Sequence, residues 1–287
     1  MRPLQALWPV DAMTTAVPSD LPPAADLTPA GQIAKLRHGD PGERYYAAWW
    51  LGRMRIPEGI PALIEALADE TDRTTQGGYP LRRNAARALG KVASPAGIPA
   101  LKEALRCSDG QVVAAAAQAL VEIALANNLD RDPRQAEELG VALLEGLRWV
   151  EQGLQTEAPA ALEALIEALG QLQVAAALGQ IRPYLEHPSI RLQCAAARAC
   201  YRLTGDPSFV QPLLSVLSHP NIHLRRAALL DLGASGYLPA AQAMAAAAVE
   251  ANIKLLALKQ LVELNLRRGK EAGTDLHQVL RLIDELL

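Results

Sequence analysis

The sequence is short of the residues from which β structure is built. Its 287 residues include 11 aromatics, and Val and Ile together number 26, whereas Ala and Leu together number 100. Strand-rich cores depend on β-branched and aromatic side chains, while Ala and Leu are strong helix formers. The composition therefore argues against a β-sandwich, a barrel or a mixed α/β sheet, and it predicts an all-α protein.

Three further shortages narrow the function classes. Three cysteines are an odd number and too few for a disulfide framework. The longest apolar run, residues 243–249, is far shorter than the roughly 20 residues that span a bilayer. We therefore expect no membrane span, no secretory signal and a cytoplasmic location. The net charge of −3 provides no overall positive field, which argues against binding to nucleic acid.

The first 29 residues differ from the rest of the chain. Six prolines fall among them, and no helical period survives that spacing. We predict a flexible Pro/Ala-rich tail over residues 1–29, within which Met13 is an alternative to Met1 as the start, and a single domain over residues 30–287. Thr28 followed by Pro29 predicts a helix N-cap with proline at the first helical position.

A six-residue column, typically Ala-Ala-x-Ala-Leu-Gly, recurs along that domain. Its copies start 38, 31, 49, 31, 32 and 30 residues apart, so four of the six intervals define a period of about 31. The copies are residues 47–52, 85–90, 116–121, 165–170, 196–201, 228–233 and 258–263. The two long intervals indicate the same period with insertions.

A second apolar segment precedes each column, as the near-identical residues 60–67 and 98–105 show most clearly. Each repeat is then a pair of helices, A followed by B, in which small Ala residues allow close packing. One such pair cannot bury its apolar face alone, whereas stacked pairs can. We predict an α-solenoid of HEAT-like helical hairpins. Glycine at the sixth column position is expected to end helices where the backbone turns to positive φ.

Aromatic and basic residues gather near the start of the domain. Tyr45 and Trp49, like Tyr46 and Trp50, are four residues apart and form adjacent stripes on one helix. The longer first interval adds a loop, residues 69–80, directly before an Arg-rich B helix. Aligning the columns places Trp49 at the position of Arg87, and Tyr46 at that of Asn84. The first two B helices should thus present aromatic rings beside arginines on one face.

The composition of this face limits its ligand. Flat rings stack on planar conjugated systems, and arginines bind carboxylates or phosphates through paired hydrogen bonds. A planar, apolar anion would fit, as would a partner protein that displays acidic residues. The alternative is purely structural: Trp49 and Trp50 cover the end of the core, and the arginines are solvated.

Other reactive residues have simpler explanations. His187 and His219 precede prolines at the same turn of consecutive repeats, which favours a capping role over metal binding. Cys194 and Cys200 are six residues apart on one helix, on different faces, and are expected to be buried. We predict no metal site, no phosphate-binding glycine loop and no catalytic nucleophile.

At these residues the chain resembles the E subunit of the heterodimeric E/F-type phycobilin lyases of cyanobacteria and red algae. The resemblance covers about residues 30–266. It is carried by residues 44–52 (Arg-Tyr-Tyr-Ala-Ala-Trp-Trp-Leu-Gly), 72–91 with the inserted Gly-Gly-Tyr-Pro-Leu-Arg-Arg-Asn, 193–198 and 224–239. A generic HEAT protein would share the Ala/Leu columns but not that insertion.

The resemblance implies a thioether-forming lyase. The E and F subunits of this family together bind phycocyanobilin and deliver it to a cysteine of the apo-phycocyanin α subunit. The acceptor thiolate adds to the ethylidene group of ring A, so the nucleophile belongs to the substrate protein. Phycocyanobilin is then a substrate, no tightly bound cofactor is expected, and the protein should work in the cyanobacterial cytoplasm in association with phycobilisomes.

The resemblance also suggests roles for individual residues. The two propionates of the bilin call for cations, and the tetrapyrrole calls for aromatic neighbours. The expected bilin-binding residues are Tyr45, Tyr46, Trp49, Trp50, Tyr79, Arg82, Arg83, Asn84 and Arg87. Asp72, in the inserted loop, is the candidate carboxylate for the pyrrole nitrogens and the one candidate catalytic residue. Catalysis would rest mainly on orientation of the electrophile.

Two other function classes stay open at this stage. A non-enzymatic HEAT-repeat scaffold could bind phycobiliproteins during the assembly or degradation of phycobilisomes without any chemistry. A HEAT-like DNA-base glycosylase is disfavoured by the net charge. The sequence identifies neither the acceptor cysteine nor the bilin isomer, and it does not divide the pocket between the two subunits.

Overall fold

The computed structural model describes residues 27–153, 159–267 and 274–287. All regular structure in these residues is helical. The α-helices are α1 (Pro29–His38), α2 (Pro41–Arg53), α3 (Ile60–Ala68), α4 (Pro80–Val92), α5 (Ile98–Ala104), α6 (Gly110–Ala126), α7 (Pro133–Gly153), α8 (Pro159–Gln171), α9 (Leu178–Ile181), α10 (Ile190–Thr204), α11 (Gln211–Val216), α12 (Ile222–Ser235), α13 (Ala241–Ala246), α14 (Ala251–Arg267) and α15 (Thr274–Asp284). Short 3₁₀ turns precede several of the odd-numbered helices.

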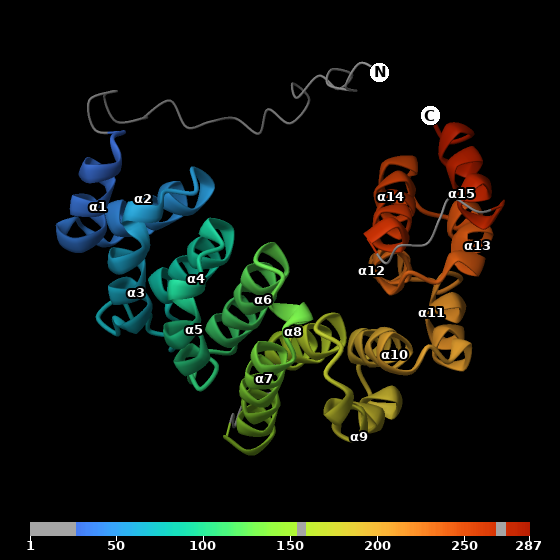
Figure 1. Ribbon diagram of the computed structural model, residues 1–287, viewed down its shortest axis with the longest axis horizontal. Helices are drawn as coiled ribbons and strands as arrows, with labels where there is room; N and C mark the ends of the chain where they lie inside the picture. Colours follow the sequence, from blue (N-terminus) through green and yellow to red (C-terminus); the bar gives the residue numbers. More distant parts are fainter. Residues whose placement is uncertain (1–26, 154–158, 268–273) are drawn as a thin grey trace.

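The helices form stacked hairpins that curve into a horseshoe (Figure 1). Each even-numbered B helix packs against the A helix before it and against the B helices of the neighbouring repeats. The B helices line the inside of the curve, and the A helices form the outer layer (Figure 1). The predicted all-α solenoid is confirmed. Residues 1–26 of the predicted tail lie outside the described residues. Helix α1 begins at Pro29, the last residue assigned to that tail.

Local sequence explains where the helices begin. The Thr28 hydroxyl accepts a hydrogen bond from the N–H of Gly31 at 3.1 Å, with Pro29 at the first helical position, as predicted. Asp40 and Glu43 form a reciprocal capping box at the start of α2. The imidazoles of His187 and His219 each accept a hydrogen bond from the backbone N–H two residues further on, at 3.0 Å, which confirms their capping role.

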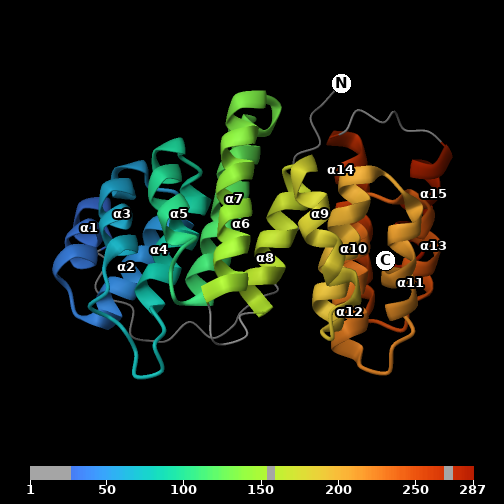
Figure 2. The same cartoon turned by 90° about the horizontal axis from the view of Figure 1, so that it is seen from below.

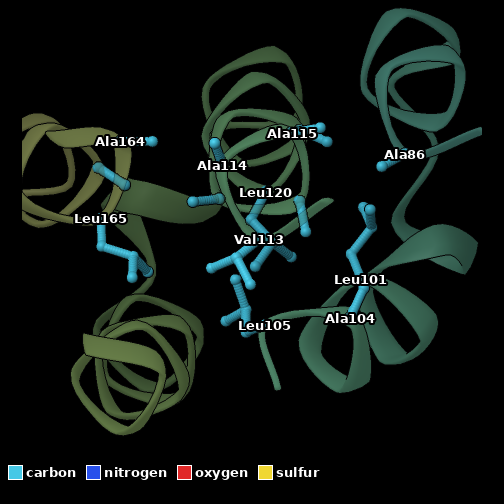
Figure 3. Close-up of a cluster of buried hydrophobic side chains, with 14 of the residues drawn as sticks. Ala86, Leu101, Ala104, Leu105, Val113, Ala114, Ala115, Leu120, Ala164 and Leu165 are labelled. Carbon is cyan, nitrogen blue, oxygen red and sulfur yellow. The ribbon is translucent and has the colours of Figure 1, made fainter. Parts of the chain in front are cut away.

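The Ala/Leu columns account for the packing. Figure 3 shows α6 presenting Ala115 towards Ala86 of α4, with Ala114 on its other side, while Leu101 of the A helix α5 and Leu105 directly after that helix fill the space below. Small residues on the flanks allow the B helices to approach, and leucines beneath fill the core between the layers. Burial of each leucine contributes about 2 kcal/mol, which is repeated along the whole array.

The column glycines have a different role from the one predicted. Gly52, Gly90, Gly170 and Gly233 lie inside B helices and do not have positive φ. A Cβ on Gly52 would lie 2.6 Å from the Cα of Ala88, and one on Gly170 would lie 2.8 Å from the Cα of Ala199. The glycines are therefore contact points at which one B helix approaches the backbone of the next.

Positive φ occurs instead three residues after the column, where the B helix has ended. Arg55, Ala93, Gln173 and Gly236 occupy this left-handed position in their repeats. Only one of the four is a glycine, so glycine is not required at this turn, although non-glycine residues adopt the conformation at some cost.

The two long column intervals have separate structural causes. The first adds the loop between α3 and α4. The second lengthens the A helix of the fourth repeat, because α7 has 21 residues and projects beyond its neighbours (Figure 2). At the far end, α15 buries Leu276, Val279 and Leu282 against the last hairpin and so covers the end of the array.

The buried core divides into two clusters that meet at α10. Two arginines of this helix contact both neighbouring B helices there. The guanidinium of Arg198 lies 2.8 Å from Glu167 of α8 and 2.7 Å from Asp231 of α12. Arg202 donates hydrogen bonds to the carbonyls of Gly170 and Ala234, at the C-terminal ends of the same two helices. The junction is thus held by polar contacts as well as by packing.

This junction makes stability depend on pH. Burial, reinforced by the charge of Glu167 and only partly offset by Arg198, raises the pKa of Asp231 from 3.8 to about 6. As pH rises, the unfolded chain therefore loses this proton at a lower pH than the folded chain does. The free energy of unfolding is highest below pH 3.8 and falls by about 3 kcal/mol between pH 3.8 and pH 6. Asp231→Asn cannot ionise and avoids this loss.

We expect the melting temperature of Asp231→Asn, relative to wild type, to rise between pH 4 and pH 6 and then to level off. Thermal unfolding of both proteins in matched buffers from pH 4 to pH 8 measures this difference. A difference that does not vary with pH would contradict a raised pKa at Asp231.

Candidate functional site

Side chains on the uncovered face of the first three B helices form a strip, here called the inner stripe; its members are exposed except for Arg83, which is half-buried. Since A helices cover one side of each B helix and neighbours cover its flanks, the remaining exposed side chains face into the horseshoe. The inner stripe consists of Tyr45, Tyr46, Trp49 and Arg53 of α2, Arg83, Arg87 and Lys91 of α4, and Gln118 and Glu122 of α6.

The α2 part of the inner stripe is aromatic. Tyr45, Tyr46 and Trp49 keep 36–40% of their surface exposed, which is unusual for large rings. The rings of Tyr46 and Trp49 lie 5.2 Å apart and are tilted by 46°. The guanidinium of Arg53 lies over the Trp49 ring at 5.6 Å. Trp50 instead packs against the core, so the structure brings three of the four predicted rings together on this face.

The α4 part of the inner stripe carries positive charge. In the described part of the chain, Arg83, Arg87 and Lys91 form neither a hydrogen bond nor an ion pair, and the Nε of Arg83 is buried without an acceptor. Arg44, by contrast, pairs with Asp69, and Arg198 pairs with Glu167. Leaving a buried guanidinium nitrogen unpaired is costly, so the α4 stripe is suited to an incoming anion.

Three of the predicted bilin-binding residues lie elsewhere. Arg82 donates hydrogen bonds to the carbonyl of Leu67 at 2.8 Å and to Glu70 at 3.0 Å, at the junction with α3. Tyr79 is only 5% exposed and lies beside Arg82, 4.9 Å from ring centroid to guanidinium. Asn84 is buried and donates to the Tyr45 carbonyl at 2.7 Å. These contacts hold α4 in place, and this structural role is sufficient to explain them.

The inserted loop is well structured and ends in a helix cap. One oxygen of Asp72 accepts a hydrogen bond from the N–H of Leu81 at 2.7 Å, which caps α4, while the other is buried without a partner. The N–H of Tyr79 donates to Asp109 of the next repeat at 2.7 Å. The candidate catalytic residue Asp72 therefore positions α4, the helix that carries the free arginines.

Four residues of the inner stripe are not among the predicted site residues: Arg53, Lys91, Gln118 and Glu122. Glu122 of α6 directly follows its column, as Arg53 and Lys91 follow theirs. Extending the alignment of the columns by one residue would have identified it. One of its carboxylate oxygens lies close to the α4 backbone, 2.6 Å from the position that a Cβ on Gly90 would take. This partial burial raises the pKa of Glu122, against the opposing effect of Lys91 and Arg55.

The chain's own cysteines are poorly suited to covalent chemistry. Cys107, Cys194 and Cys200 are all buried. Burial raises the pKa of Cys194 to about 12 and that of Cys200 to about 11, which disfavours the reactive thiolate. Among the described residues, no three His, Cys, Asp or Glu side chains lie close enough together to hold a metal ion.

Nor does any helix within residues 27–153, 159–267 and 274–287 combine the length and the apolar character that a membrane span requires.

Comparisons with known proteins agree with this arrangement. The family model for HEAT repeats matches residues 30–121, 72–152, 147–233 and 180–257. A phycocyanobilin lyase subunit alpha of Nostoc sp. (strain PCC 7120) is 46% identical over 270 residues, which covers 91% of this chain and 94% of the relative. The bilin biosynthesis protein PecE of Mastigocladus laminosus is 45% identical over 240 residues, covering 83% and 82% of the two chains.

A solved structure extends the likeness to three dimensions. A chain in the complex of CpcE and CpcF of phycocyanin lyase from Nostoc sp. PCC7120 superposes with a TM-score of 0.79 at 42% sequence identity. The match covers 96% of this chain and 100% of that one. At this identity and coverage, the chain belongs to the HEAT-repeat family of phycocyanobilin lyase alpha subunits, which includes PecE.

Proposed function

We propose that this protein, together with an F-type partner subunit, binds phycocyanobilin and attaches it through a thioether bond to a cysteine of the phycocyanin α subunit. The observation that carries the proposal is the inner stripe, where exposed rings lie beside Arg83 and Arg87, which form no hydrogen bond or ion pair with any residue that the structure describes. A planar conjugated molecule with two carboxylates satisfies both halves of this surface.

The inner stripe would act chiefly by orientation. Arg83 and Arg87 would bind the propionates, while Tyr46 and Trp49 would pack against the conjugated rings. Fixing the bilin in this way would present the ring A ethylidene to the acceptor thiol in one geometry and convert an encounter reaction into a directed one. Exclusion of water from the horseshoe by the partner would strengthen the arginine–carboxylate contacts.

The reaction itself adds a thiol across a carbon–carbon double bond. The acceptor sulfur bonds to the outer ethylidene carbon, and a proton is placed on the adjacent ring carbon. No redox change occurs, so neither a redox cofactor nor a metal is required by the balance. We place this activity in the cytoplasm of a cyanobacterium, in association with phycobilisomes.

Coexpression with an F-type partner, phycocyanobilin and apo-phycocyanin α tests the proposal. We expect a covalent, fluorescent adduct that forms faster than spontaneous addition. An adduct no more abundant than the spontaneous background would refute the enzymatic function. A non-enzymatic scaffold would bind the apo-protein yet leave the pigment spectrum unchanged.

A further inference from the structure

Glu122 differs from the other carboxylates on the inside of the horseshoe. Glu163 pairs with Arg191, and Glu167 and Asp231 share Arg198. Glu122 forms no hydrogen bond and no ion pair with any described residue. It is thus a carboxyl that no described residue holds by a hydrogen bond or a short ion pair, and it lies on the same stripe as Arg83 and Arg87.

The position of Glu122 depends on a glycine of the neighbouring helix. One of its carboxylate oxygens lies 2.6 Å from the position that a Cβ on Gly90 would take, and Ala119 packs against the same glycine. The carboxyl therefore lies against the α4 backbone, although the residue as a whole stays exposed. The charged groups that act on it are Lys91 of α4 and Arg55 of the turn after α2.

Glu122 lies close enough to α4 to contact a ligand that is bound there. Packed helices lie about 8–10 Å apart, and Glu122 leans from α6 over α4, next to Lys91. A tetrapyrrole whose propionates bind Arg83 and Arg87 would extend along the inner stripe beyond these two residues. The carboxyl of Glu122 would then border the conjugated system.

On the basis of the proposed function, we propose that Glu122 supplies the proton that accompanies thiol addition to the bilin. As the acceptor sulfur bonds to the outer ethylidene carbon, the electron pair of the double bond moves to the ring carbon. That carbon takes the proton from the carboxyl of Glu122. The proton released by the acceptor thiol returns to the carboxylate, so the net change is addition of S–H across the double bond.

The surroundings of Glu122 suit this cycle. Partial burial favours the protonated acid before the transfer. Lys91 and Arg55 then stabilise the carboxylate that the transfer leaves behind. General acid catalysis requires a group that can both donate the proton and carry the charge that the transfer leaves behind.

The test compares wild type with Glu122→Gln in the complete E/F complex supplied with phycocyanobilin and apo-phycocyanin α. Affinity for the bilin, measured by absorbance titration, should change by less than about twofold. The rate of covalent attachment should fall about 100-fold, the lower end of the contribution expected of a general acid. Glu122→Asp should recover part of the rate, and Glu137→Gln on the outer helix α7 is the matched control.

The pH profile separates catalysis from a merely structural role. Because the donor must be protonated, the wild-type rate should fall as pH rises through the raised pKa of Glu122. The residual rate of Glu122→Gln should lack that fall. An unchanged rate, or a variant profile that keeps the same fall, would overturn the role of Glu122 and leave the lyase function intact.

Two further outcomes of the binding and attachment measurements can be told apart. Weaker bilin binding with normal attachment of the bound pigment would make Glu122 a binding residue and overturn its role as proton donor. If the wild-type complex itself neither binds nor attaches the bilin, the proposed function fails, and the role of Glu122 fails with it.

Discussion

The Arg83→Ala/Arg87→Ala double variant is expected to bind phycocyanobilin about 100-fold more weakly than wild type. Each arginine would lose a charge-assisted contact with a propionate, worth about 1.5–3 kcal/mol; the lower value for both gives about 3 kcal/mol, which corresponds to roughly 100-fold in affinity. Absorbance titration of the bilin into the E/F complex measures the change. The overall fold should tolerate both substitutions, because within residues 27–153, 159–267 and 274–287 neither side chain has a hydrogen bond or ion pair to lose.

Arg82 provides a matched control one residue away. Its guanidinium bonds to the Leu67 carbonyl and to Glu70 at the junction with α3. Arg82→Ala should therefore lower the melting temperature while leaving bilin affinity nearly unchanged, and Arg148→Ala on α7 should change neither. Equal losses of affinity in Arg82→Ala and in the double variant would contradict the assignment of the site to the inner stripe.

Substituting a column glycine by alanine is expected to destabilise the fold strongly. A Cβ on Gly52 would lie 2.6 Å from the Cα and 2.7 Å from the Cβ of Ala88. Two helix backbones must separate to relieve this overlap, which costs about 3 kcal/mol and outweighs the roughly 1 kcal/mol gained from helix propensity. Gly52→Ala should thus lower the melting temperature by several degrees.

Gly179 in α9 is the comparison, because a Cβ there would meet no atom within 4 Å. Gly179→Ala should leave the melting temperature unchanged or raise it slightly. Thermal unfolding of the two variants under identical conditions decides the matter. Similar shifts for Gly52→Ala and Gly179→Ala would show that the columns do not mark close helix contacts.

The sequence predicted the scaffold well because repetition reveals a shared environment. A residue type that recurs every 31 positions must meet the same neighbours in every hairpin, so the column identified the B helices without any alignment. The same pattern misled on the glycines. A glycine near a helix end suggests positive φ. The glycine is needed instead because the backbone of the next repeat comes close to it, and the adjacent sequence carries no sign of that contact.

The candidate site was predicted in part, for a geometric reason. Adjacent residues on a helix point about 100° apart, so Arg82 faces the A helix while Arg83 belongs to the inner stripe. Sequence proximity grouped Tyr79, Arg82 and Asn84 with the site, but the structure uses them to hold α4. Glu122 was not predicted as a site residue because its placement depends on a contact with Gly90, which belongs to a different repeat.

The most direct test of the central claim is ¹⁹F NMR of the E/F complex labelled with fluorotryptophan. This chain contributes four tryptophans, which single Trp→Phe variants assign. Trp49 on the inner stripe and Trp149 on the outer helix α7 are both exposed, at 36% and 46%. Addition of phycocyanobilin should shift or broaden the Trp49 resonance and leave Trp149 unchanged. A response at Trp149 with none at Trp49 would contradict a bilin site on the inner stripe.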